Sequence, residues 1–350
     1  MLIKRFCTLC MKSAVDISNQ GSKRFYSAST KLTNTEVRKK RNAIFDEEKQ
    51  RQREAFVKRV EKITVDYSGP PENVTLLMNK DISTPYNCAM HVHEYLMKRS
   101  VVALVNGQPW DMHRPLEENC SLEFKHMLEV DTKLVNEVFW RSGAFALGHV
   151  LETAFKDDVY VELCSFPKVP VQYGCFAYDV DLKLPDWKPT QRELTGLGMV
   201  GGRLWGHNWD IERLDVDASV ALKMFADNRF KSDQIPDIAA KSDHNRVIIY
   251  RMGDHIDITK GPLIANTSQF YRFQVTAIHQ ISSQRYGSLQ RVQAIALPSA
   301  LMMHWWSWEL LCERAAKPMM YMLPDAFLKP KQEEIDDKEG DRLVSSTSSS

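Results

Sequence analysis

The sequence has no long hydrophobic run and few cysteines. Its longest apolar stretches, such as Val101–Val105, are far shorter than the roughly 18 residues that a membrane-spanning helix needs. The seven cysteines are odd in number and scattered, so they form no disulfide framework and indicate a reducing compartment. We therefore expect no membrane span and no fold that depends on disulfides.

An excess of charge of one sign is also lacking. The 350 residues carry 46 Lys and Arg against 45 Asp and Glu, a net charge of +1, whereas non-specific binding of nucleic acid needs surplus positive charge. The average hides a gradient, because residues 1–26 carry +4, residues 27–60 carry +5 and residues 61–328 carry −6. A basic N-terminal arm precedes a mildly acidic body.

Residues 1–26 have the composition of a mitochondrial transit peptide. They are basic, contain hydroxyl residues and lack the continuous apolar core of a secretory signal. The stretch Arg24-Phe-Tyr-Ser27 resembles a mitochondrial processing site, which predicts cleavage after Tyr26. The alternative is a frayed basic N-terminus.

The arm, residues 27–60, is predicted to be helical. Thr33-x-x-Glu36 is a capping box that opens a charged helix from about Glu36 to Lys62. Its apolar stripe is thin, so we expect no stabilisation by burial within its own domain. Its basic residues either bind RNA phosphates or form a solvated face, and the two alternatives stay open. The RNA-binding candidates are Lys39, Lys40, Arg41, Arg51, Arg53, Lys58 and Arg59.

The next segment, residues 61–128, predicts a β-grasp domain. Strands are expected at Ile63–Val65 and Thr75–Met78, and a helix begins at Thr84-Pro85. The pair Asn106-Gly107 predicts a hairpin between Val101–Val105 and the strand that follows, and Ser121–Lys125 completes the sheet.

These residues resemble a known family. Ser83–Ala89, Ala103–Asp111 and Arg114–Glu117 resemble the N-terminal TGS domain of threonyl-tRNA synthetase. The resemblance continues, over residues 61–285, into that enzyme's editing-type domain, on the stretches Phe139–Gly148, Gly174–Asp179, Tyr250–Asp254 and Ile256–Pro262. It implies an α+β fold in which the charged N-terminal helix, the β-grasp domain, an editing-like α+β domain (residues 129–297) and a C-terminal helix follow one another.

The resemblance also locates an ancestral site. In such enzymes two histidines one helical turn apart face a C-x-x-x-H loop, because residues at i and i+4 lie on one helix face. Here the corresponding positions are Arg141 and Phe145 on the helix, and Thr259 and Leu263 in the loop. Arginine stays protonated, and phenylalanine and leucine neither bind a metal nor transfer a proton, so we expect no deacylation, no metal and no cofactor.

One further motif matches a binding fingerprint only as a string. Gly196-x-Gly198-x-x-Gly201 fits the dinucleotide pattern, but no strand is predicted before it and no helix after it. We interpret it as a flexible loop.

The C-terminal region, residues 298–328, predicts an amphipathic helix. Leu301, Trp305, Trp308 and Cys312 recur at helical spacing, and Trp305 and Trp308 are expected to pack on the preceding domain. Trp306 lies off that stripe, so Trp306, Met319 and Tyr321 are candidates for a contact with another protein. The tail, residues 329–350, has too few apolar residues to fold.

Together these features resemble a synthetase-related protein family of the mitochondrial large ribosomal subunit. The resemblance implies a non-catalytic structural protein of the mitochondrial matrix that contacts ribosomal RNA and neighbouring ribosomal proteins and takes no small-molecule substrate. Two alternatives remain, a free-standing hydrolase that edits mischarged tRNA and a dispersed RNA-binding regulator.

Overall fold

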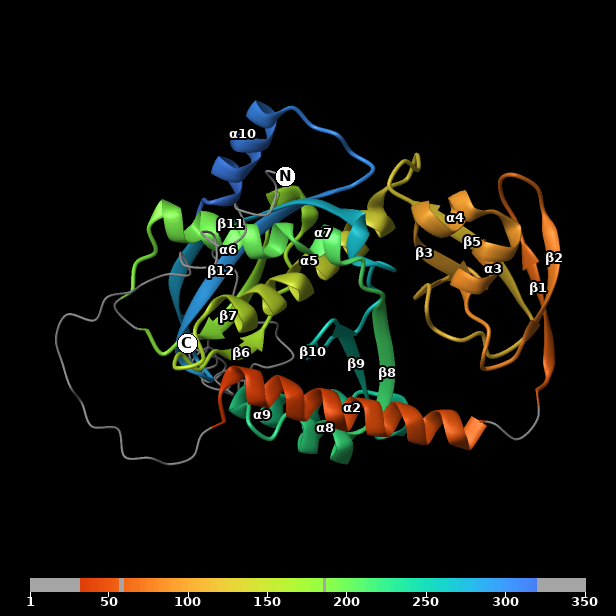
Figure 1. The fold of residues 1–350 in the computed structure, drawn as a ribbon, viewed down its shortest axis with the longest axis horizontal. Helices are drawn as coiled ribbons and strands as arrows, with labels where there is room; N and C mark the ends of the chain where they lie inside the picture. Colours follow the sequence, from red (N-terminus) through yellow and green to blue (C-terminus); the bar gives the residue numbers. More distant parts are fainter. Residues whose placement is uncertain (1–31, 57–59, 185–186, 320–350) are drawn as a thin grey trace, which may run out of the picture.

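The computed structural model describes residues 32–56, 60–184 and 187–319. The predicted presequence and C-terminal tail lie outside the described residues, as do Lys58, Arg59 and Tyr321. The predicted α+β fold is confirmed: a long N-terminal helix runs along one side of a mixed body, and a β-grasp unit lies at the end of the molecule (Figure 1). No helix among the described residues combines the length and the apolar character needed to cross a membrane.

The N-terminal helix, α2, spans Asn34–Phe56. Its capping box forms as predicted, since the Thr33 amide donates to Glu36 Oε2 at 2.8 Å and the Glu36 amide donates to Thr33 Oγ1 at 3.2 Å. The expectation that this helix is not buried was wrong. Val37, Ile44 and Phe45 are buried, and Ile44 and Phe45 join an apolar cluster with residues of α8, α9, β8, β9 and β10. Three buried apolar positions are enough to dock α2 on the body, because ion pairs hold the rest of the helix.

The β-grasp unit has five strands in the order β2-β1-β5-β3-β4, with β1 and β5 parallel. The predicted hairpin at Asn106-Gly107 joins β3 to β4, and both residues have positive φ, at 50° and 76°. Thr84 caps the helix that crosses the sheet. That helix breaks at His93, which is extended, and so forms two pieces. The elements are β1 (Lys62–Tyr67), β2 (Val74–Asn79), α3 (Pro85–Val92), α4 (Glu94–Arg99), β3 (Ser100–Val105), β4 (Gln108–Trp110) and β5 (Cys120–His126).

The larger body contains a four-stranded sheet, β11-β12-β7-β6, and a three-stranded sheet, β10-β9-β8. Helix α5 contacts β7 and β12 of the first sheet and β10 of the second. The strands are β6 (Glu162–Ser165), β7 (Phe176–Asp181), β8 (Ile211–Asp217), β9 (Arg246–Met252), β10 (His255–Ile258), β11 (Phe270–Ser283) and β12 (Gly287–Pro298). The helices are α5 (Lys133–Ala154), α6 (Gln191–Gly202), α7 (Leu204–His207), α8 (Ala218–Met224), α9 (Arg229–Ala239) and α10 (Trp305–Ala315), with short 3-10 turns at Val171–Tyr173, Asp243–Asn245 and Thr267–Gln269.

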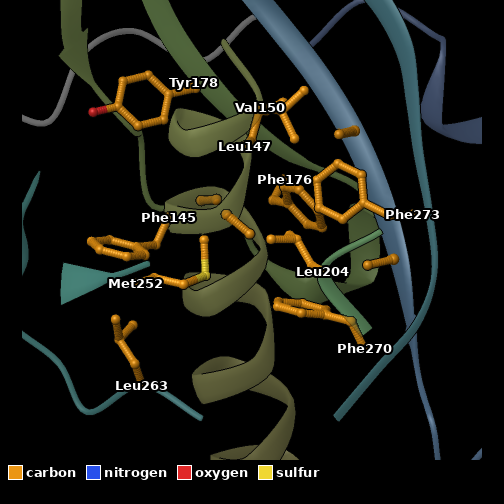
Figure 2. Packing of buried hydrophobic residues seen from close by; sticks show 14 of the residues in the cluster. Phe145, Leu147, Val150, Phe176, Tyr178, Leu204, Met252, Leu263, Phe270 and Phe273 are labelled. Atoms are coloured by element: carbon orange, nitrogen blue, oxygen red, sulfur yellow. The ribbon is translucent and has the colours of Figure 1, made fainter. Parts of the chain in front are cut away.

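Helix α5 lies at the centre of the main core (Figure 2). Two glycines allow its close approach to the strands: a Cβ at Gly143 would lie 2.5 Å from the Phe176 ring, and one at Gly148 would lie 2.9 Å from His255 Nε2. The helix therefore packs backbone to ring against both sheets.

The segment predicted to be a loop, Gly196–Gly201, is instead part of α6. Its signal was Thr190-x-x-Glu193, a capping box whose hydrogen bonds form in the structure. Gly198 and Gly201 face β11, where an added Cβ would lie 2.7 Å from Gln274 and 2.2 Å from Phe273. These glycines pack a helix on a sheet, and the dinucleotide fingerprint is excluded.

The C-terminal helix forms as α10, shorter than predicted. Trp308 is half-buried and packs against a small apolar cluster around Ala315. Trp305 was predicted to pack as well, but it is 58% exposed, because the inward row of α10 runs through Trp308, Leu311 and Ala315. The outward face of this helix is thus more apolar than the sequence pattern indicated.

Candidate functional site

The structure brings together the helix and the loop that the synthetase resemblance assigned to an ancestral site. Arg141 and Phe145 lie on α5, and Thr259 and Leu263 lie after β10. Arg141 Nη1 donates to the Pro262 carbonyl at 2.9 Å, which joins helix to loop. Figure 2 shows Phe145 and Leu263 on the same side of α5.

Apolar side chains fill the site. Phe145 is 0% exposed, and its ring lies edge-on to those of Tyr250 and His255. Leu263 is 1% exposed. The hydroxyl of Thr259 is the remaining polar group of the loop pair, and a hydroxyl without an adjacent base is a weak nucleophile. These four positions offer no group able to activate water.

Directly beside them lies a buried ionic network that the sequence analysis missed. Glu152 Oε1 accepts from Arg41 Nη1 of α2 at 2.7 Å, and Glu152 Oε2 lies 2.6 Å from His255 Nδ1. Burial alone would raise the pKa of Glu152, but attraction to Arg41 and His255 lowers that pKa to about 2. A signal for this network was present in the sequence. The next position of the i, i+4 series after Arg141 and Phe145 is His149, and Glu152 lies about one helical turn further on.

Two histidines complete this network. The rings of His149 and His255 have centroids 6.1 Å apart, and burial together with repulsion from His255 lowers the pKa of His149 to about 4. Both are buried, and His149 Nδ1 and His255 Nε2 form no hydrogen bond with any residue that the structure describes. Among the described residues, no group of three or more His, Cys, Asp or Glu side chains is arranged to hold a metal ion.

The β-grasp unit fixes the loop through Asp111. Asp111 Oδ1 accepts from the Leu263 amide at 2.9 Å, and Asp111 Oδ2 accepts from the Tyr250 hydroxyl at 2.7 Å. Arg213 of β8 lies 3.4 Å from the same carboxylate. The loop that would carry half of an editing site is therefore held rigidly between the two units.

A second buried network lies on the same face of β10, because Asp257 follows His255 by two residues in the strand. Lys231 Nζ lies 2.5 Å from Asp257 Oδ1, and the Tyr178 hydroxyl donates to Asp257 Oδ2. Burial, followed by the charge of Asp257, raises the pKa of Tyr178 well above its usual value. Both oxygens of Asp257 are thus bound by side chains of the fold.

The basic residues of α2 are largely paired with the acidic body. Four of them form ion pairs with carboxylates outside the helix, in the pairs Arg38–Asp254, Lys40–Asp227, Arg41–Glu152 and Lys49–Glu212. Arg51 pairs with Glu48 of the same helix. The prediction of Arg41 as a phosphate ligand was wrong, because Arg41 is 3% exposed and its guanidinium is hydrogen-bonded to Glu152. Lys40 is also engaged, and is less available to phosphate.

Two candidates remain open on this helix. Lys39 and Arg53 are exposed, and neither makes a salt bridge to any residue that the structure describes. Because they lie 14 positions apart, almost four helical turns, they are on the same side of α2, away from its buried residues.

The C-terminal candidates for a contact with another protein have different surroundings. Trp306 is 62% exposed on α10. Met319 is half-buried, with its sulfur 3.3 Å from Cys175 Sγ and its amide donating to Gln293 Oε1 at 3.2 Å. Met319 therefore packs against its own fold, and of the two candidates that the structure describes, Trp306 is the one available for a contact with another protein.

Comparison with known proteins identifies the family. Residues 73–125 match the TGS domain family. The large ribosomal subunit protein mL39 of Drosophila melanogaster is 41% identical over 296 residues, which are 84% of this chain and 88% of that protein. The chain belongs to the mL39 family. The mL39 proteins are ribosomal proteins of the mitochondrial large subunit.

This mL39 family member is also similar to threonyl-tRNA ligases. The human cytoplasmic threonine–tRNA ligase 2 is 30% identical over 236 residues, 67% of this chain but 27% of that enzyme. The bovine cytoplasmic ligase 1 is 29% identical over 248 residues and is covered to 32% of its length. The mL39 chain thus shares with these enzymes a segment of at most about a third of their length, and the predicted synthetase resemblance is confirmed.

Proposed function

We propose that this mL39 family member is a non-catalytic structural component of the mitochondrial large ribosomal subunit. The observation that supports this best is the apolar filling of the ancestral site, where Phe145 and Leu263 are fully buried. A buried phenylalanine and leucine can bind neither metal nor water, and they convert a reactive pocket into a core. The family relationship supplies the ribosomal context.

The alternative of a free-standing tRNA-editing hydrolase has no support in this geometry. Its base would have to be one of the remaining histidines. His255 is 0% exposed and hydrogen-bonded to Glu152, and His149 is 6% exposed beside Trp209. A catalytic base must reach the substrate or a water, and these two rings are enclosed by the fold.

Contacts with ribosomal RNA are proposed at the exposed side of α2. Lys39 and Arg53 are exposed there, and in the sequence Lys58 and Arg59 continue the basic stretch. Since most other charges of α2 are paired internally, we expect a small RNA contact rather than a basic stripe along the whole helix. Neighbouring ribosomal proteins account for the remaining contacts.

Sedimentation tests the proposal. Mitochondrial lysate is fractionated on sucrose gradients, with and without removal of magnesium to separate the subunits. The protein is expected with the large subunit in both gradients. Recovery only near the top of the gradient at low salt contradicts the proposed function and favours a dispersed RNA-binding protein.

A second assay addresses catalysis. Purified protein is incubated with threonine-specific tRNA that carries a wrong amino acid, and the loss of the ester-linked amino acid is followed against buffer alone. We expect no acceleration of this loss, because the side chains of the four ancestral positions cannot act as a base. These positions are Arg141, Phe145, Thr259 and Leu263. Acceleration that disappears in His255→Ala would restore the editing hypothesis.

A further inference from the structure

Helix α10 exposes a concentrated apolar surface. Trp305 is 58% exposed, Trp306 is 62% exposed and Leu310 is 55% exposed. In the segment leading to the helix, Met302 is 81% exposed and Leu301 is 41% exposed. Five large apolar side chains within ten residues form a patch of the kind that marks protein interfaces, which are enriched in tryptophan and methionine.

This surface is not an unfinished part of the core. The opposite side of α10, with Trp308, Leu311 and Ala315, already packs against Cys175 and Ile295. The helix is anchored there by Gln293, whose amide donates to the Ala315 carbonyl at 2.7 Å and to the Lys317 carbonyl at 2.9 Å. In Figure 1, α10 lies at the edge of the body, far from the β-grasp unit. Its outward face is therefore rigidly presented to the surroundings.

Two carboxylates lie among the exposed rings. Trp305, Glu309 and Glu313 follow one another at intervals of four, and Trp306 and Leu310 form the adjacent row. Glu309 and Glu313 are exposed and make no salt bridge within the described ranges. The outward face of α10 is thus apolar and negatively charged at the same place.

We propose that the outward face of α10, defined by Trp305, Trp306, Glu309, Leu310 and Glu313, binds a segment of a neighbouring protein that carries apolar anchors flanked by lysine or arginine. The rings and Leu310 would bury the anchors, and the two carboxylates would pair with the basic groups. The inference rests on the proposed function, since the partner is a neighbour within the ribosomal subunit.

The same two carboxylates argue against the other occupants. RNA phosphates would be repelled by Glu309 and Glu313. A symmetric contact between two copies through this face would bring two pairs of glutamates into the same interface. The chain's own C-terminal segment is also acidic, because residues 320–350 contain seven acidic and four basic residues. Only a basic partner neutralises this face.

Site-specific photocrosslinking in assembled particles tests the proposal. The full-length protein with Trp306→p-benzoylphenylalanine is expressed in mitochondria, large subunits are isolated on a gradient and irradiated, and the crosslinked peptides are identified by mass spectrometry. We expect a crosslink to one protein segment with apolar residues and Lys or Arg within about one helical turn. The yield should fall about tenfold when Glu309→Lys and Glu313→Lys are added, because like charges then oppose each other.

Controls separate the inference from folding and from the proposed function. Ser307→Ala, on the same helix, should leave the crosslink yield unchanged, and matching thermal melting curves show that the charge-reversed protein is folded. Crosslinks to RNA, to a second copy or to residues 320–350 overturn the inference, as does a yield insensitive to the charge reversal. A protein that co-sediments with the large subunit but gives no crosslink also overturns it, while leaving the proposed function intact. Failure to co-sediment overturns both.

Discussion

Arg41 shows how a charge that suggests RNA binding in the sequence can be consumed within the fold. Arg41 belongs to the run Lys39-Lys40-Arg41, and the three side chains of this run have different surroundings. Lys39 is exposed, Lys40 pairs with Asp227 and Arg41 is buried against Glu152. Helical geometry separates adjacent residues by about 100°, so a basic run cannot point in one direction. Candidate phosphate ligands on a helix have to be taken from one face.

The Arg41–Glu152 pair predicts a large loss of stability in Glu152→Gln. Removal of one partner of a buried ion pair leaves the other charge uncompensated, which typically costs about 3–5 kcal/mol. We expect a fall in the free energy of unfolding of this size, measured by urea denaturation. Glu47→Gln, at an exposed position of α2, serves as the control and should change the free energy by less than about 0.5 kcal/mol. Equal effects of the two variants would show that the buried pair contributes nothing.

The stability of the protein should fall with pH in two steps. The pKa of His149 is lowered from 6.5 to about 4 in the folded protein, so the unfolded chain binds the proton first and stability is lost as pH falls from 6.5 towards 4. The pKa of Glu152 is lowered from 4.5 to about 2, which extends the loss below pH 4.5. Urea unfolding at a series of pH values should show both steps.

A histidine variant identifies the first step. His149→Gln should flatten the dependence of the unfolding free energy on pH between 6.5 and 4. The exposed His91→Gln should leave it unchanged. A slope that survives in His149→Gln would assign the titration to another group.

At the scale of elements, the sequence predicted those features that depend only on neighbouring residues. The Thr84 cap, the Asn106-Gly107 hairpin and the strands of the β-grasp unit were all predictable, because each depends on residues within a few positions. Helix α6 was missed because four glycines lowered its apparent propensity. Two of these glycines are required by β11, a strand about 75 residues later, and no local pattern contains that information.

The glycines of α6 therefore predict opposite effects for the same substitution. Gly201→Ala would place a Cβ 2.2 Å from the Phe273 ring, and overpacking of this kind typically costs about 1–3 kcal/mol. Gly196→Ala meets no atom within 4 Å and should stabilise the protein by up to about 1 kcal/mol. Thermal unfolding of both variants measures the difference. If both variants are stabilised, α6 does not pack closely on β11.

The candidate site was predictable only in part. The four ancestral positions were located from the synthetase resemblance, and the structure joins their helix and loop through Arg141 and Pro262. The side chains that stabilise this region were not predicted to do so. Arg41 lies on α2, Glu152 on α5 and Asp111 in the loop after β4, and only the folded chain brings them to the same site.

For the whole molecule, the charge gradient along the sequence has an internal explanation. The positive arm lies against the negative body, and four ion pairs join α2 to Glu152, Glu212, Asp227 and Asp254. The excess that suggested an RNA-binding arm is used mainly to hold that arm in place. Deletion of residues 27–60 would therefore unfold part of the body, because Ile44 and Phe45 belong to its core.

Charge reversal at the two free positions tests RNA contact more cleanly than deletion. We expect Lys39→Glu with Arg53→Glu to weaken incorporation into large subunits, with the deficit largest at low salt and shrinking as salt is raised, because the loss of two phosphate contacts reduces the salt dependence of binding. The amount of protein co-sedimenting on gradients of increasing salt measures this. Lys98→Glu, on the β-grasp unit, is the control. Incorporation equal to the control would remove α2 from the RNA interface.

The docking of α2 also has a consequence in time. Its partners lie between 111 and 216 residues further along the chain, from Glu152 to Asp254. During synthesis or import, this helix is complete long before the carboxylates that neutralise it exist. It remains cationic and undocked until the chain as far as β10 has folded, and contacts of such high sequence separation form late. The docking of α2 is therefore a late step of folding, and a protein whose α2 is undocked still exposes the positive charge of this helix.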